Sequence, residues 1–249
     1  MKRLFLVFVT ALLLGGGLWS CEKDNAPNNT SSTSSSGSGT GNVDNPGSGQ
    51  SADGWVDLGL PSGLLWAECN VGASSPEAYG DYFAWGETAP KEVYNWSTYV
   101  HANGDYDQLT KYCSDSFYSS DGSTDDLTLL QPSDDAATAN LGNGARIPTK
   151  GEWEELLANT NSVWEMQNGI MGRTFTASNG KSIFLPAAGS RWDDNLNSEG
   201  QTGYYWSSTL CAESPDNAWD FDFHSSYQGV NDHFRRGRGF SVRAVRSAH

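Results

Sequence analysis

Positive charge is scarce in this sequence. It contains 30 Asp and Glu residues against 15 Lys and Arg residues, and its formal net charge is −15. Nucleic acids and anionic membrane surfaces attract basic proteins, because opposite charges lower the energy of the encounter. We therefore expect no nucleic-acid partner and no binding of the chain to an anionic bilayer through its charge.

A hydrophobic run long enough to span a membrane is also lacking at the N-terminus. The apolar run Leu4–Leu14 follows Lys2 and Arg3 and is about half the ~20 residues that a spanning helix needs. Two basic residues, a short apolar core and a small residue before a cleavage point are typical of a secretory signal peptide. We therefore predict a signal peptide over residues 1–20.

Cys21 directly follows the small residue Ser20. This arrangement resembles the bacterial lipobox, in which the cysteine thiol is acylated and becomes the first residue of the mature protein. The alternative is a plain secreted protein in which Cys21 has no such role. The next residues, Glu22-Lys23-Asp24, resemble an export signal for the outer face of the outer membrane. The prediction is lipidation at Cys21, with the protein anchored in the outer membrane and facing the cell exterior.

Aromatic residues are missing from residues 25–53, which consist almost wholly of Asn, Ser, Thr, Gly and Pro. Such a segment cannot bury enough apolar surface to offset the entropy cost of ordering it. We expect residues 21–53 to form a lipidated, flexible tether. About 30 flexible residues have a root-mean-square span of roughly 30 Å, which holds a following domain clear of the membrane.

Leu, Ile and Val are few in the rest of the chain, whereas tryptophan is frequent. The chain has 10 tryptophans, and all except Trp19 come after Cys21. These large rings must therefore supply much of the core of one domain over residues 54–246. Cysteine is rare there, and the odd number, Cys69, Cys113 and Cys211, allows at most one internal disulfide. We predict Cys69–Cys113, with Cys211 free.

Turn residues are dense in this domain and helical periodicity is rare, which indicates many short strands. The expected strands are Val56–Leu58, Leu65–Asn70, Asp81–Trp85, Arg173–Ala177, Lys181–Leu185, Tyr204–Ser208, Trp219–Phe223 and Phe240–Val245. A helix over Asp134–Asn140 is expected to be capped by Ser133 and ended by Gly142. A second helix is expected after the capping box of Thr149 and Glu152. Two short helices among many short strands predict the α+β class.

Several longer motifs then occur in a fixed order. They are "VDLGLPSGLLWAECNVGA" (56–73), "YGDYFAWGET" (79–88), "ARIPTKGEWEELL" (145–157), "SIFLPAAG" (182–189), "GYYWSST" (203–209) and "GFSVRAVR" (239–246). As an ordered set they resemble the Fibrobacter succinogenes major paralogous domain of bacterial surface lipoproteins. That domain is related to the formylglycine-generating-enzyme branch of the C-type lectin fold. The resemblance implies a C-type lectin-like fold, with two helices around a small twisted antiparallel sheet whose ends pair with each other.

The resemblance to formylglycine-generating enzymes raises the alternative that the chain is a catalyst. Their chemistry depends on two cysteines close together just before the closing strand. The corresponding stretch here, residues 224–238, contains no cysteine, and Cys211 lies upstream and alone. Two thiolates for redox or copper chemistry are therefore missing. We expect a non-catalytic protein, because a fold does not carry its function with it.

The sequence also gives little sign of a metal site. His101, His224, His233 and His249 have no metal-ligand spacing to one another. C-type lectins bind sugar through calcium held by a Pro-containing loop and a Trp-Asn-Asp triplet. Residues 131–133 (Gln-Pro-Ser) and 230–232 (Val-Asn-Asp) resemble these only faintly. We expect no cofactor, with calcium as the alternative.

The segment after residue 216 begins with strict alternation. One face of the strand carries Trp219, Phe221 and Phe223, and we expect this face to lie in the core. The opposite face and the following Gly-, Asn- and Arg-rich loop carry polar side chains that we expect to project. We predict that these side chains bind a ligand: Asp220, Asp222, His224, Ser226, Tyr227, Asn231, Asp232, His233, Phe234, Arg235 and Arg238.

The composition of this segment is unusual in a second way. Residues 214–249 contain no Lys, Glu or Met, yet they include arginines 235, 236, 238, 243 and 246. Arg and Tyr are frequent binding hot spots. Asn codons randomised at their two adenines can encode every one of the eleven projecting residues, but never Lys, Glu or Met. The segment therefore resembles the variable region of retroelement-diversified proteins, which use C-type lectin folds as receptor-binding scaffolds. Ordinary loop divergence is the alternative.

These features together predict a surface-displayed lipoprotein whose variable binding region lies within residues 210–238. Its partner would be a protein or glycan ligand on another cell, a phage or a host surface. The alternatives are a formylglycine-generating-enzyme-like catalyst and a structural adhesin or pilus component.

Overall fold

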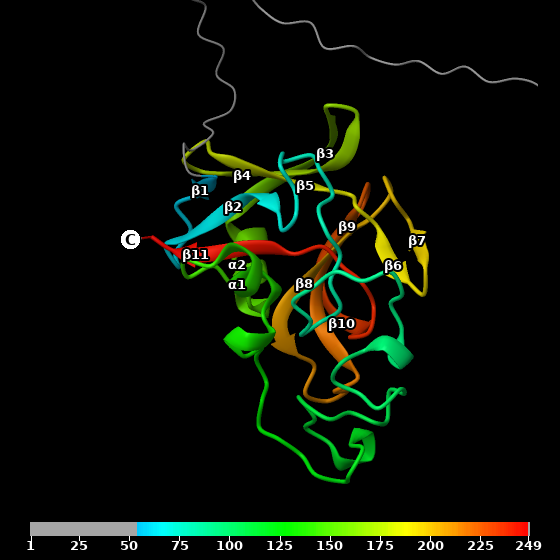
Figure 1. The fold of residues 1–249 in the computed structure, drawn as a ribbon. Helices are drawn as coiled ribbons and strands as arrows, with labels where there is room; N and C mark the ends of the chain where they lie inside the picture. The colour runs from blue at the N-terminus through cyan, green and yellow to red at the C-terminus, as the bar shows by residue number, and fades with distance from the viewer. Residues whose placement is uncertain (1–53, 249) are drawn as a thin grey trace, which may run out of the picture. The chain divides into compact units, whose positions relative to one another are not determined.

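The computed structural model describes residues 54–248, and the predictions for residues 1–20, for residues 21–53 and for Cys21 lie outside these residues. Strands from the two ends of the described chain pair in its first sheet (Figure 1). The strand β1 (Trp55–Asp57) pairs with β2 (Leu64–Asn70), and β2 also pairs with the closing strand β11 (Arg243–Ser247); both pairings are antiparallel. The sequence prediction that the ends pair is confirmed.

The second sheet has the order β3-β4-β5. Its strands are β3 (Thr160–Gln167), β4 (Ile170–Ala177) and β5 (Ser182–Pro186). The predicted hairpin around Asn179-Gly180 joins β4 to β5, and Gly180 takes the positive φ of 80° that this turn needs. Strand β3 was not predicted, although a second Asn-Gly pair, Asn168-Gly169, joins it to β4 with positive φ at both residues.

The third sheet has the order β8-β9-β10, which leaves β10 at its edge. Its strands are β8 (Gly203–Leu210), β9 (Asn217–His224) and β10 (Tyr227–Arg235). A two-stranded ribbon, β6 (Ser190–Trp192) with β7 (Asn195–Asn197), lies between the second and third sheets in the chain. Figure 1 shows the third sheet below the sheet β3-β4-β5, with β11 and the helices near both. Rings of the two sheets are in contact, as Phe221 is with Phe175 at 5.7 Å.

Two α-helices are present among the described residues. The capping box of Thr149 and Glu152 begins α2 (Lys150–Asn159), as predicted. The helix α1 (Ala136–Leu141) ends at Gly142 as predicted, but its cap is Asp135, which accepts from the Thr138 amide, and not Ser133. Ser133 lies instead in a 3-10 turn, η3 (Pro132–Asp134). Two further 3-10 turns are η1 (Trp96–Thr98) and η2 (Ser116–Tyr118).

Two predicted strands are shorter than expected. Residues 81–85 contribute a single bridge, Phe83 to Phe240, because positive-φ glycines at 80 and 86 bend the chain on both sides. The closing strand starts at Arg243, and residues 239–241 form isolated bridges to three different segments. The described chain is therefore built from small antiparallel sheets with two short α-helices, consistent with the predicted α+β class.

Tryptophan rings fill the centre of the domain, as predicted. Trp66, Trp85, Trp153 and Trp206 are each at most 1% exposed. The Trp153 ring, on α2, lies 4.9 Å from the Trp66 ring and 4.8 Å from the Phe221 ring, so it joins the first and third sheets. Removal of such a ring costs about 3–5 kcal/mol of stability.

Candidate functional site

Most of the predicted binding region forms one β-hairpin, β9–β10. Its register pairs Tyr227 with His224, Gly229 with Asp222, and Asn231 with Asp220. The prediction of a loop after residue 224 is therefore wrong over Tyr227–Arg235, which form a strand. The chain continues pairing because the two-residue turn Ser225-Ser226 reverses it directly. Asp232 and His233 together face the single residue Trp219, and this one extra residue shifts the register before Phe234 and bulges the edge strand.

One face of β9 is core, as the alternation predicted. Phe221 and Phe223 are fully buried, and the Phe221 ring lies 5.7 Å from that of Phe175 on β4. Trp219 shares this face but is only half-buried. The Lys150 ammonium lies 3.5 Å from the centre of the Trp219 ring, which is a cation–π contact at the start of α2.

The opposite face of β9 differs from the prediction, because Asp220 and Asp222 do not project into solvent. Asp220 is 0% exposed and Asp222 is 9% exposed. The reason is that aromatic rings also pack on this face. Phe234 of β10 lies 5.2 Å from Tyr204 of β8 and 5.3 Å from Phe240. The sheet is thus packed on both sides around the middle of β9.

The Asp220 carboxyl group has an unusual environment. Neither of its oxygens has a hydrogen-bond partner. Burial, then the nearby charges of Asp222 and Asp232, raise the pKa of Asp220 well above its usual range. A buried carboxylate without a partner is so costly that the group takes up a proton instead. The hairpin therefore contains an acid that weakens the fold whenever it is ionised.

A chain of polar side chains leads from Asp222 to the surface. The Asn231 amide donates to Asp222, and the Tyr227 hydroxyl donates to the Asn231 side-chain oxygen at 3.1 Å. Tyr227 is 41% exposed and stacks on the His224 ring, with centroids 5.6 Å apart. Burial raises the pKa of Asp222, and the Asn231 hydrogen bond opposes this increase.

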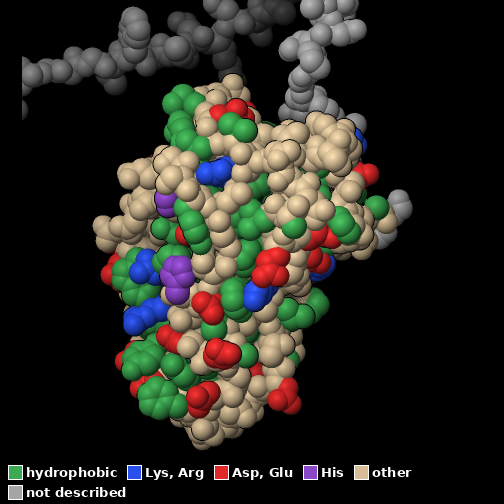
Figure 2. All heavy atoms as spheres, turned by 180° about the vertical axis from the view of Figure 1, so that it is seen from behind, with side chains coloured by type: hydrophobic (Ala, Val, Ile, Leu, Met, Phe, Trp, Pro, Cys, Tyr) green, Lys and Arg blue, Asp and Glu red, His purple; other side chains and the backbone are tan. Residues whose placement is uncertain are grey.

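A second group of predicted residues surrounds Phe234. The His233 ring lies 4.3 Å from the Phe234 ring. The Arg238 guanidinium lies 5.6 Å from the Phe234 ring and 4.9 Å from the Trp192 ring. These contacts hold the Arg238 charge over aromatic faces, where it remains half-buried. Figure 2 shows one face of the domain, on which basic, acidic, histidine and hydrophobic side chains are interspersed.

Nine of the eleven predicted binding residues therefore reach solvent. The exposed ones are Ser226, Tyr227, His233 and Arg235, and the half-buried ones are His224, Asn231, Asp232, Phe234 and Arg238. We call these nine residues the hairpin surface. Asp220 and Asp222 lie beneath it.

Two of the five C-terminal arginines are structural, which corrects the interpretation of the cluster as a recognition signal. Arg236 is fully buried and donates to the Tyr112 carbonyl at 3.0 Å. Arg243 is fully buried and donates to the Ala67 and Phe184 carbonyls, each at 2.9 Å. These guanidinium groups satisfy carbonyls of distant segments and cannot contact a partner.

The predicted Cys69–Cys113 disulfide is wrong, since Cys69, Cys113 and Cys211 are all free. Cys69 lies on β2, whereas the Cys113 thiol packs in another cluster and donates to the Asp115 carbonyl at 3.2 Å. Cys211 lies 3.8 Å from an Asp232 carboxylate oxygen. Burial raises the pKa of all three thiols, which makes them weak nucleophiles at neutral pH.

Acidic, histidine and cysteine side chains do not converge as metal ligands anywhere in residues 54–248. The faint calcium motif is divided between two places: Gln131 precedes the turn η3, while Asn231 and Asp232 lie on β10. Among the helices that the structure describes, none is both long and apolar enough to cross a membrane.

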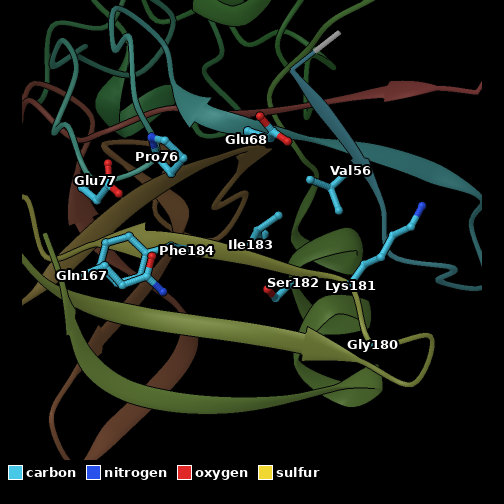
Figure 3. A pocket seen from close by; sticks show the side chains of 10 residues that line it. All are labelled: Val56, Glu68, Pro76, Glu77, Gln167, Gly180, Lys181, Ser182, Ile183 and Phe184. Atoms are coloured by element: carbon cyan, nitrogen blue, oxygen red, sulfur yellow. The ribbon is translucent and has the colours of Figure 1, made fainter. Parts of the chain in front are cut away.

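A pocket of about 280 Å³ lies away from the hairpin surface, and none of the eleven predicted residues lines it (Figure 3). Its floor includes Ile183 and Phe184 of β5, and its polar walls include Glu68, Glu77 and Lys181. Sequence reasoning missed this pocket because its residues come from separate segments and form no motif. A second pocket, of about 260 Å³, lies between Leu129 and Ser208 and is lined mainly by apolar groups and Arg146.

The comparisons with known proteins find one similarity. Residues 164–245 match a family model described as a domain of unknown function, DUF8237. The matched stretch begins within β3 and ends within β11, so it includes the whole β9–β10 hairpin. No curated protein and no solved structure matches the chain.

Proposed function

We propose that this chain is a surface-displayed lipoprotein that binds a protein or glycan ligand through the hairpin surface. In this proposal, Cys21 carries the lipid, residues 21–53 form the tether, and residues 54–246 form a C-type lectin-like domain. The anchor lies in the outer membrane and the domain faces the exterior. The protein is a receptor and not a catalyst.

One observation carries the proposal. Eight chemically varied side chains leave a single hairpin and Arg238 follows shortly after it, while Phe221 and Phe223 of the same hairpin are fully buried. A rigid buried strand beside exposed Tyr, His and Arg side chains is a suitable scaffold for recognition, because exposed residues can change without disturbing the core. Arg235 and Tyr227, which are both exposed, are the residue types that most often dominate binding energy.

Retroelement diversification of residues 210–238 is part of the proposal. The genetic test is to sequence this region and the neighbouring DNA in many isolates. We expect substitutions concentrated in codons of the hairpin surface, together with an adenine-rich copy of the 3′ end beside a reverse transcriptase gene. Identical codons in all isolates, with no such copy nearby, would exclude diversification.

The binding proposal has a separate test at the cell surface. The full chain is displayed on cells, and candidate partner cells and phages are captured with it. The variant combining Tyr227→Ala, His233→Ala and Arg235→Ala should lose capture and keep its thermal unfolding midpoint. A variant with Glu154→Gln, at an exposed carboxylate of α2, serves as the control and should capture normally. Equal capture by the triple variant would show that the hairpin surface is not the binding site.

The anchor is tested by metabolic labelling with a radioactive fatty acid. The natural chain should be labelled and fractionate with outer membranes. The Cys21→Ser variant should be unlabelled and released. Labelling that persists in this variant would contradict acylation at Cys21.

A further inference from the structure

The pocket beside β5 is formed by segments that are far apart in the sequence. Glu68 comes from β2, Glu77 from the loop after it, Gln167 from the end of β3, and Lys181 from the turn between β4 and β5. The floor is apolar and closed, since Ile183 and Phe184 are 3% and 4% exposed. Apolar floors with a few convergent polar groups are typical of small-molecule sites, and about 280 Å³ is near the lower size limit of such sites.

The walls of this pocket are held in place from behind. The buried Arg243 donates to the carbonyl oxygens of Glu68, in a wall of the pocket, and of Phe184, in its floor. Its guanidinium therefore fixes the separation of β2 and β5. The side-chain amide of Gln167 donates to Glu165 at 3.0 Å and to Thr174 at 2.9 Å, which leaves its own oxygen without a donor. Such fixed groups bind a ligand without losing further conformational entropy.

The pocket carries opposite charges at its two ends. Figure 3 shows Glu77 at one end and Lys181 at the other, with Phe184 and Ile183 between them. The Asn168 amide donates to Glu77 and holds its carboxylate in position. Hydrogen bonds, first from its own backbone amide, lower the pKa of Glu77, so it is ionised at neutral pH. Lys181 is exposed and forms no ion pair with any described residue.

We propose that this pocket binds a short peptide with free ends, with its ammonium group at Glu77 and its carboxylate at Lys181. Charge-assisted hydrogen bonds at both ends select a molecule with both charges, and the apolar floor accepts the carbon atoms between them. The Gln167 oxygen offers a further acceptor for the ammonium group. This site does not depend on the hairpin surface or on its proposed function.

The test is isothermal titration calorimetry of the full chain with alanine peptides of two to four residues, and with free alanine as the control, because its two charges share one carbon atom and cannot reach both ends of the pocket. N-acetyl-Ala-Ala lacks the ammonium charge and Ala-Ala-amide lacks the carboxylate, so they are matched probes. We expect at least one peptide to bind with a Kd below about 10 mM. Each single-charge analogue of a binding dipeptide should bind about tenfold more weakly, as loss of one charged hydrogen bond predicts.

Variants of the two ends sharpen the test. Glu77→Gln should weaken zwitterion binding about tenfold and remove the preference for a free ammonium group. Lys181→Met should remove the preference for a free carboxylate, and because Lys181 is exposed this variant should fold normally. Glu154→Gln, at an exposed carboxylate of α2, is the matched control and should bind like the natural chain. The proposal is overturned if no peptide binds, or if both end variants bind as tightly as the natural chain.

Discussion

Strands β9 and β10 are neighbours in one sheet, yet their side chains occupy very different surroundings. On β9, Phe221 and Phe223 on one face and Asp220 on the other are fully buried. On β10, Tyr227, His233 and Arg235 are exposed, because this strand forms the edge of the sheet. We therefore expect the two paired strands to tolerate change to different degrees: β9 fixes the scaffold, whereas β10 combines the packed Phe234 with exposed side chains that the scaffold does not need.

The largest expected loss of stability comes from a substitution in the core of β9. Phe221→Ala should lower the free energy of unfolding by about 3–5 kcal/mol, because the ring leaves a cavity between Trp153 and Phe175. Urea denaturation measures the change. A loss below about 1 kcal/mol would mean that β9 is not a core strand.

A somewhat smaller loss of stability should distinguish Arg236 from Arg238. Arg236→Met should cost about 2–4 kcal/mol, because the Tyr112 carbonyl loses its buried donor. Arg238→Met should cost less than about 1 kcal/mol, since Arg238 is half-buried and contacts only aromatic rings by charge. Thermal unfolding of both variants checks the difference, and equal losses would contradict it.

Substitution of Asp220 should raise the free energy of unfolding, whereas the substitutions above lower it. Its folded pKa is raised, so the protonated acid stabilises the fold below the unfolded pKa, near 4, and this contribution is lost as pH rises through the folded pKa. Asp220→Asn removes the charge and should raise the free energy of unfolding by about 1–3 kcal/mol at pH 8. The gain should shrink towards pH 4. Urea titrations at both pH values test this, and a gain independent of pH would point to another cause.

Changes on β10 should be small. Tyr227→Ala and His233→Ala should each change the free energy of unfolding by less than about 0.5 kcal/mol, as is usual for exposed positions. A loss of more than about 2 kcal/mol in urea denaturation would show that β10 is part of the scaffold. In that case the contrast between the two strands would disappear.

The smallest expected effect concerns the thiols. Because Cys69, Cys113 and Cys211 are free, dithiothreitol should leave the thermal midpoint of unfolding unchanged within about 1 °C. Thiol titration of the denatured, unreduced chain should detect all three. A clear fall of the midpoint on reduction would show that a disulfide is present after all.

Local signals predicted several turns and helix ends of the fold. The hairpin at Asn179-Gly180 and the start of α2 at Thr149 depend on turn and capping chemistry within a few residues. Where several neighbours compete for one role, the prediction was less accurate. Ser133 and Asp135 are both good caps, and only the packing of buried Ala136 and Ala137 decides between them.

Long-range packing explains what the sequence could not predict. Alternation along β9 distinguishes its two faces. It does not reveal that Phe234, which lies beyond β9 in the sequence, packs with Tyr204 over the second face. The strand β10 was missed because Ser225-Ser226 is a weak turn signal. The burial of Arg236 and Arg243 was equally hidden, since their partners lie more than a hundred residues earlier, at Tyr112 and Ala67.

The pairing of β2 with β11 has a consequence for how the protein is made. Arg243 reaches back 176 residues to the Ala67 carbonyl, and β11 completes the sheet that β1 and β2 begin. Chain growth from the ribosome delivers β11 after every other strand of the described chain. The first sheet therefore cannot close before β11 has been synthesised, and contacts of such long range make closure slow.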